Sequence, residues 1–176
     1  METTERIVEA YMRYIKGCAT IPNIRCPGQF EIDLLAINPA TDQRFHIETS
    51  VSISSNFSLL NDKVFDPKLL KQRVHIAPQR RTLGYFADRK FSAPGVVSAL
   101  GEYGFKQGNY AKVIVSWGWM PGAQETAATH GIELWNFGDM MREIADEFLG
   151  TRHYFTDDTM RTLHLFAQAL PEIQSE

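Results

Sequence analysis

The chain has 176 residues, of which 44% are hydrophobic and 22% charged, and its formal net charge is −3. This length fits one domain with a sizeable hydrophobic core, and the composition excludes disordered and fibrous proteins. The negative charge argues against a protein that coats nucleic acid through charge alone.

The chain shows no targeting or membrane signal. Charged residues are spread through the first 17 residues, so this stretch resembles neither a signal peptide nor a membrane span. No stretch approaches the roughly 18 apolar residues that a span requires. We therefore expect a cytoplasmic protein without membrane contact. Cys18 and Cys26 should be free thiols, because their spacing matches neither a metal motif nor a disulfide framework.

The apolar pattern predicts alternating helices and strands. Thr3 or Thr4 should cap the first helix and Gly17 should end it. The elements expected, in chain order, are a helix to residue 16, strands at 29–38 and 44–54, a helix at 66–75, a basic connection at 77–95, a helix at 95–105, a strand at 111–117, a helix at 121–131, a strand at 132–137, and helices at 138–150 and about 156–170.

This order of elements predicts the fold class. The first two strands should form an antiparallel hairpin, because turn residues separate them. The later strand, helix and strand should form a right-handed crossover between parallel strands. The expected fold is α/β, with a central mixed β-sheet flanked by helices, in a single domain (residues 1–176) whose core spans 1–147.

The hairpin carries the residues that suggest chemistry. Alternation along the strands should place Asp33, Glu48 and Ser50 on one face. Two neighbouring carboxylates repel each other, and a divalent cation relieves the repulsion. Mg²⁺ held there could activate a water for attack on a phosphodiester. The alternative is a solvent-facing hairpin whose acids have no role.

The stretch EIDLLAINPATDQRFHIETS, residues 31–50, resembles the core motif of the PD-(D/E)xK, or restriction-endonuclease-like, nuclease superfamily. In that motif an Asp on one strand precedes a hairpin and an (E/Q)xK sequence. Residues 4–17 and 111–141 are similar to the first helix and the later strand, helix and strand of the Mrr-like branch. The resemblance covers about residues 1–147, except for the basic segment. It implies a restriction-endonuclease-like fold and metal-dependent hydrolysis of DNA.

Carried over residue by residue, the resemblance implies roles for four positions. Asp33, Glu48 and the carbonyl of Thr49 would bind Mg²⁺ or Mn²⁺. Glu5 would assist from the first helix, and Glu9 is the alternative.

The motif lysine is absent, because Ser50 stands at its position. A serine hydroxyl cannot neutralise the charge that develops on the phosphate. A lysine could have migrated, with Lys68 and its neighbours Lys63 and Lys71 as candidates. The alternative is a catalytically inactive module that keeps the nuclease fold and binds nucleic acid or a protein partner.

Positive charge is concentrated between Lys63 and Lys112, where ten Lys and Arg outnumber three acidic residues. Within this segment Arg80, Arg81, Arg89 and Lys90 alternate with aromatic residues and could contact a nucleic-acid backbone. A solvated connection or an oligomer contact is an equal alternative. DNA is the expected partner and RNA the second candidate. A homo-oligomer or a larger defence or repair assembly is compatible with this pattern.

Three further residues have two interpretations each. His46 lies on the carboxylate face and could bind a metal or phosphate, or be an ordinary strand residue. Trp117 and Trp119 follow the buried strand at its carboxyl end, where open sheets often bind ligands. Core packing is the favoured interpretation for both.

Overall fold

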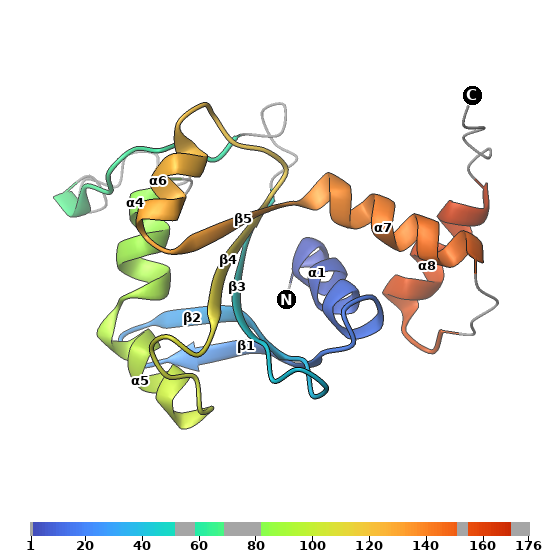
Figure 1. Ribbon diagram of the computed structural model, residues 1–176, viewed down its shortest axis with the longest axis horizontal. Helices are drawn as coiled ribbons and strands as arrows, with labels where there is room; N and C mark the ends of the chain where they lie inside the picture. The colour runs from blue at the N-terminus through green and yellow to red at the C-terminus, as the bar shows by residue number, and fades with distance from the viewer. Residues whose placement is uncertain (1, 52–58, 69–81, 151–154, 170–176) are drawn as a thin grey trace.

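The computed structural model describes residues 2–51, 59–68, 82–150 and 155–169 (Figure 1). Its elements in chain order are α1 (Thr3–Tyr14), β1 (Ala19–Cys26), β2 (Phe30–Ile37), β3 (Arg44–Ser50), α4 (Leu83–Tyr85), the π-helix η1 (Phe86–Phe91), α5 (Pro94–Glu102), β4 (Ala111–Ser116), α6 (Ala123–Thr129), β5 (Ile132–Asn136), α7 (Phe137–Gly150) and α8 (Asp158–Ala169).

The five strands form one mixed sheet in the order β1-β2-β3-β4-β5. β1 pairs antiparallel with β2 and β2 with β3, whereas β3, β4 and β5 run parallel. The expected α/β class, with a mixed sheet flanked by helices, is therefore confirmed. The antiparallel hairpin and the parallel crossover are confirmed as well.

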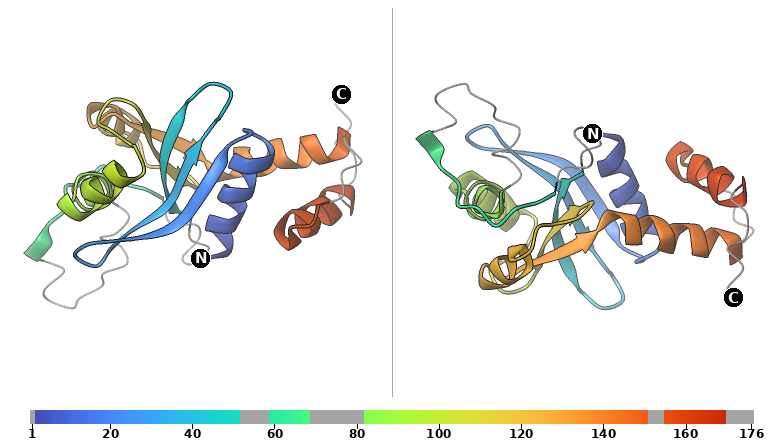
Figure 2. Two further views of the ribbon diagram at one scale, coloured as in Figure 1. Left: turned by 90° about the horizontal axis from the view of Figure 1, so that it is seen from below. Right: turned by 90° about the horizontal axis from the view of Figure 1, so that it is seen from above.

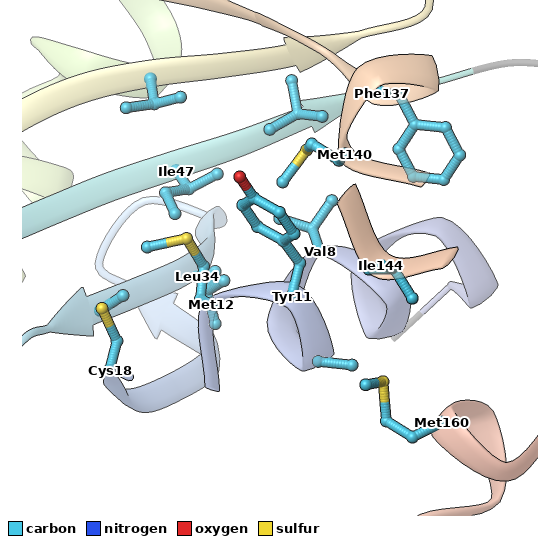
Figure 3. Close-up of a cluster of buried hydrophobic side chains, with 14 of the residues drawn as sticks. Val8, Tyr11, Met12, Cys18, Leu34, Ile47, Phe137, Met140, Ile144 and Met160 are labelled. Atoms are coloured by element: carbon cyan, nitrogen blue, oxygen red, sulfur yellow. The ribbon is translucent and has the colours of Figure 1, made fainter. Parts of the chain in front are cut away.

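Helices cover both faces of the sheet (Figures 1 and 2). On one face α1 and α7 pack against β2, β3 and β4, and α8 packs against them from outside. Figure 3 shows this core, in which Val8 and Met12 of α1 approach Leu34 and Ile47 of the strands. On the other face α5 covers β1 and β2, while α4, η1 and α6 cover β4 and β5. A polar residue of the central strands is therefore enclosed on either face.

Three boundaries or elements differ from the sequence expectation. The cap of α1 is Glu2, one residue before the expected threonines, and the Glu5 side chain accepts a hydrogen bond from the Glu2 N–H at 2.9 Å. β1 was not expected from the sequence, because Pro22 interrupts its strand pattern. The proline is tolerated because β1 lies at the edge of the sheet. The part of the expected connection from residue 82 onward is helical, as α4 and η1. Residues 52–58 and 69–81 lie outside the described residues, and with them most of the expected helix at 66–75.

Cys18 and Cys26 are buried free thiols, as expected. Among the described residues, no helix is long and apolar enough to cross a membrane.

Gly95 allows α5 to dock against the turn between β1 and β2. A Cβ at Gly95 would lie 2.0 Å from the Pro27 carbonyl oxygen, whereas a Cβ at Gly101 of the same helix would contact nothing within 4 Å. We therefore expect Gly95→Ala to lower the free energy of unfolding by about 1–3 kcal/mol through overpacking. Gly101→Ala should raise it by up to about 1 kcal/mol through helix propensity. Urea unfolding measures both, and equal stabilities for the two variants would contradict this docking.

Candidate metal and catalytic site

Asp33 and Glu48 meet where the pairing of β2 and β3 ends. The last paired residues are Leu34 and Ile47. Asp33 directly precedes Leu34 on β2, and Glu48 directly follows Ile47 on β3. In place of a ladder bond, the Thr49 N–H donates to Asp33 Oδ2 at 2.8 Å, and the Asp33 N–H faces Glu48 Oε1 at 3.5 Å. The structure thus brings the two carboxylates together in the gap between the strands.

Lys90 joins these two carboxylates from the opposite layer. Its Nζ lies 3.0 Å from Asp33 Oδ1 and 2.5 Å from Glu48 Oε2, and it donates to the Glu31 carbonyl oxygen at 3.0 Å. The contact with Glu48 Oε2 is an ion pair between two largely buried side chains. One ammonium therefore contacts carboxylates from two strands.

The cluster is buried beneath η1. The Glu48 side chain is 0% exposed, Asp33 12% and Lys90 19%. Phe91, which follows Lys90 on η1, packs edge-on against the His46 ring with the centroids 4.7 Å apart. The alternative of a solvent-facing hairpin is therefore wrong, because a helical layer covers the carboxylate face.

His46 orients Glu48. Its Nε2 lies 2.9 Å from Glu48 Oε1, and both side chains are fully buried. Burial lowers the pKa of His46 to about 3, and the positive charge of Lys90 acts in the same direction. The ring is therefore neutral and donates its Nε2 proton to the carboxylate, which fixes one Glu48 oxygen and leaves the other toward Lys90.

The charge of the cluster is close to balanced at neutral pH. Burial raises the pKa of Asp33 to about 7, and the Glu48 charge adds to this rise while Lys90 opposes it. Burial also raises the pKa of Glu48 to about 7, against the lowering effect of Lys90. For Lys90 burial lowers the pKa, but the charges of Glu48 and Asp33 outweigh it, so the net shift is upward. The lysine therefore stays charged, and the two carboxyl groups titrate as a coupled pair.

Glu5 and Glu9 of α1 are the two candidates for an assisting carboxyl group. Glu5 is half-buried, and this burial raises its pKa. A hydrogen bond from the Glu2 backbone opposes the rise, whereas the charge of Asp33 adds to it. Glu9 instead accepts a hydrogen bond from the Thr20 hydroxyl at 2.9 Å. Glu5 is therefore the candidate whose pKa responds to the charge of Asp33.

Thr49 and Ser50 end β3 beside the cluster. The Thr49 N–H points at Asp33. The N–H and C=O of an extended residue lie on the same side of the strand, so the Thr49 carbonyl faces the same gap. Ser50 is half-buried and lies in register with Ser116 of β4.

The basic residues expected from the sequence are dispersed. Lys63 and Lys68 are exposed, and Arg89 lies over the Phe30 ring at 4.8 Å from its centroid. Lys71, Arg80 and Arg81 lie outside the described residues.

Lys90 is the component that the sequence interpretation assigned to a different role. It was expected to contact nucleic acid from an irregular connection, whereas it lies on a π-helix and contacts both carboxylates. Its 57-residue separation from Asp33 follows no motif spacing. Nothing in the local sequence distinguishes Lys90 from the other cations of the basic segment.

The donor set suits magnesium or manganese better than zinc or calcium. In the part of the chain that is described, no group of three or more His, Cys, Asp or Glu side chains could hold a metal ion. The available donors are two carboxylates and the Thr49 carbonyl, and Mg²⁺ needs only one or two carboxylates because it keeps several waters. Glu48 Oε2 lies 2.5 Å from the Lys90 ammonium, so a metal ion bound there would share this oxygen with the lysine.

Comparison with known proteins adds no relative. No protein-family model, no curated protein and no solved structure matches the chain.

The raised carboxyl pKa values predict a pH-dependent stability. A carboxyl group whose pKa rises from about 4 in the unfolded chain to about 7 stabilises the fold below pH 4. That contribution is lost as the pH rises through 7. Glu48→Gln removes one such group, so between pH 5 and pH 8 the parent should lose about 1–3 kcal/mol more unfolding free energy than the variant.

Urea unfolding across this pH range measures the difference. Glu102→Gln, at an exposed glutamate of α5, is the matched control and should follow the parent. Parallel curves for the parent and Glu48→Gln would show that burial does not disfavour the Glu48 charge.

Proposed function

We propose that the chain is a restriction-endonuclease-like, metal-dependent nuclease that hydrolyses phosphodiester bonds in DNA. The observation that carries this proposal is the Lys90 ammonium within 3.0 Å of both Asp33 and Glu48. It supplies the positive charge that Ser50 lacks, at the carboxylates where the family motif places its lysine.

A purely structural triad is a poorer explanation of this cluster. Buried ion pairs contribute little net stability, because desolvation offsets their attraction. Lys90 is also carried by a π-helix, an element that is rare and frequently found at functional sites. Strongly shifted pKa values of mutually contacting groups point in the same direction.

Each residue has a defined role in the proposed reaction. Asp33, Glu48 and the Thr49 carbonyl would hold Mg²⁺ or Mn²⁺, which when bound polarises a phosphoryl oxygen and lowers the pKa of a water. Lys90 offsets negative charge that develops on the phosphate. His46 keeps the Glu48 carboxylate in place through the 2.9 Å contact. Glu5 adds a further carboxyl group at the edge of the site.

DNA is the proposed substrate, with RNA as the second candidate. The excess of seven positive charges between residues 63 and 112 supports a phosphate-binding surface. Arg89, exposed on η1 one residue before Lys90, lies on the element that supplies the site lysine.

One observation favours the alternative of an inactive module. The ammonium of Lys90 already has three oxygen neighbours within 3.0 Å, so the carboxylates have a counterion without any metal. A nuclease fold that had lost its chemistry could retain such a triad as a structural element.

Metal binding tests the first step of the proposal. Isothermal titration of the parent with Mn²⁺ should give one site, and Asp33→Asn should weaken binding by at least roughly tenfold because a direct ligand is lost. Asp88→Asn is the matched control, because Asp88 is exposed on η1 and should leave binding unchanged. Absence of binding heat in the parent would remove the metal site.

DNA cleavage tests the role of Lys90. With Mg²⁺ or Mn²⁺ the parent should nick plasmid DNA, and Lys90→Ala should lower the rate by roughly 10²–10³, as for other single electrostatic donors. Lys106→Ala, at an exposed lysine far along the chain from η1, is the control. If Lys68→Ala abolishes cleavage and Lys90→Ala does not, the lysine assignment is wrong. A parent that leaves supercoiled, linear and single-stranded DNA and RNA intact would support the inactive module.

A further inference from the structure

A concave site separate from the carboxylate cluster lies beside the edge strand β5. It has a volume of about 360 Å³ and is lined by α1, β5, α7 and the segment after β4. We call it the tryptophan pocket, because two of the three tryptophans of the chain line it. The lining residues used below are Tyr11, Lys16, Trp119, Trp135, Asp139 and Glu143.

Both indoles are held in place and partly exposed. The backbone around Trp119 is fixed by Leu60, whose N–H donates to the Gly118 oxygen at 3.0 Å and whose oxygen accepts from Met120 at 2.9 Å. Trp135 packs edge-on against Phe45 with the centroids 5.6 Å apart. Its Nε1–H donates to Glu133 at 3.0 Å, so both aromatic walls exist before any ligand arrives.

The charges at the pocket are balanced by local partners. Glu143 accepts hydrogen bonds from the Tyr11 hydroxyl at 2.6 Å and from Lys16 at 3.0 Å. Asp139 forms an ion pair with Arg142. A site with aromatic walls and internally neutralised charges suits an uncharged planar group better than a phosphate or a metal ion.

The position of the pocket relates it to the carboxylate site. Thr49, Val115 and Trp135 occupy one cross-strand row, because Thr49 pairs with Val115 and Val115 with Trp135. Neighbouring strands lie about 4.8 Å apart, so the backbones of Thr49 and Trp135 are separated by about 10 Å. The pocket opens on the face covered by α1 and α7, whereas Glu48 lies on the opposite face, beneath η1. A strand that reaches both sites would therefore cross the edge at which β3, β4 and β5 end, where α/β sheets commonly bind ligands.

We propose that the tryptophan pocket binds an unpaired nucleobase of the nucleic-acid strand whose phosphate lies at Asp33 and Glu48. The inference rests on the proposed function and names its substrate class, a strand with at least one unpaired base. A base inside a duplex is stacked on its neighbours and cannot enter the pocket, whereas a single strand offers the face of every base to an indole.

Binding without metal tests this inference. In EDTA, anisotropy of a fluorescein-labelled 12-nucleotide single strand should show tighter binding than the same sequence as a duplex. Trp119→Leu should weaken single-strand binding by about tenfold, the effect of losing one stacked base. Trp119→Phe keeps an aromatic ring and should stay within about threefold of the parent. Trp117→Leu, at a tryptophan outside the pocket lining, is the control.

A measurement on the unchanged protein keeps the test valid if the Trp119 variants fail to fold. The unlabelled single strand should quench the intrinsic tryptophan fluorescence of the parent. The inference is overturned by no quenching, by equal binding of the parent and Trp119→Leu, or by duplex binding as tight as single-strand binding. AMP or TMP bound as tightly as the 12-mer would identify a free-nucleotide site in place of a strand-binding site.

These outcomes are separate from those of the proposed function, because binding in EDTA requires neither metal nor cleavage. Trp119-dependent binding by a protein that cleaves nothing would leave the pocket in place and reject the nuclease. If Trp119→Leu changes neither cleavage nor single-strand binding, the nuclease proposal is kept and the base-binding pocket is rejected.

Discussion

The organisation of the sheet depends on the ion pairs of Lys90 with Asp33 and Glu48. Two carboxylates enclosed between helical layers are unfavourable without a nearby positive charge, because burial penalises ionisation and the charges repel each other. Lys90 provides this charge and also reaches the Glu31 carbonyl, so a single side chain joins η1 to β2 and β3. The pairing of β2 and β3 can therefore end at the carboxylates while Glu48 stays fully buried and Asp33 mostly buried.

The parts of the fold that sequence predicts correctly are those fixed by local pattern. The alternation in β2 and β3 and the turn between them determine a hairpin, and the apolar run of β4 determines a buried central strand. β1 was missed because Pro22 contradicts the strand pattern and only the position of β1 at the sheet edge makes it acceptable. Its tertiary position, which no local pattern encodes, overrides its local propensity.

In the candidate site, too, local pattern predicts some features and tertiary packing determines the others. Strand alternation placed Asp33 and Glu48 together, because both lie on one rigid hairpin. It could not give their burial, which depends on η1, nor the identity of the lysine, which lies 57 residues after Asp33 in the sequence. A cation delivered by tertiary packing has no spacing signature, so Lys90 is indistinguishable in sequence from the exposed Lys68.

The location of the lysine matters less for the proposed chemistry than the location of its charge. A lysine at position 50 would reach the carboxylates from β3 itself, whereas Lys90 reaches them from the helical layer above. Moving the cation to η1 leaves the end of β3 with the small side chain of Ser50, in register with Ser116 of β4. Small residues therefore occupy the last positions of both β3 and β4. The substitution that first suggests a lost activity is therefore compatible with a strand crossing this edge of the sheet.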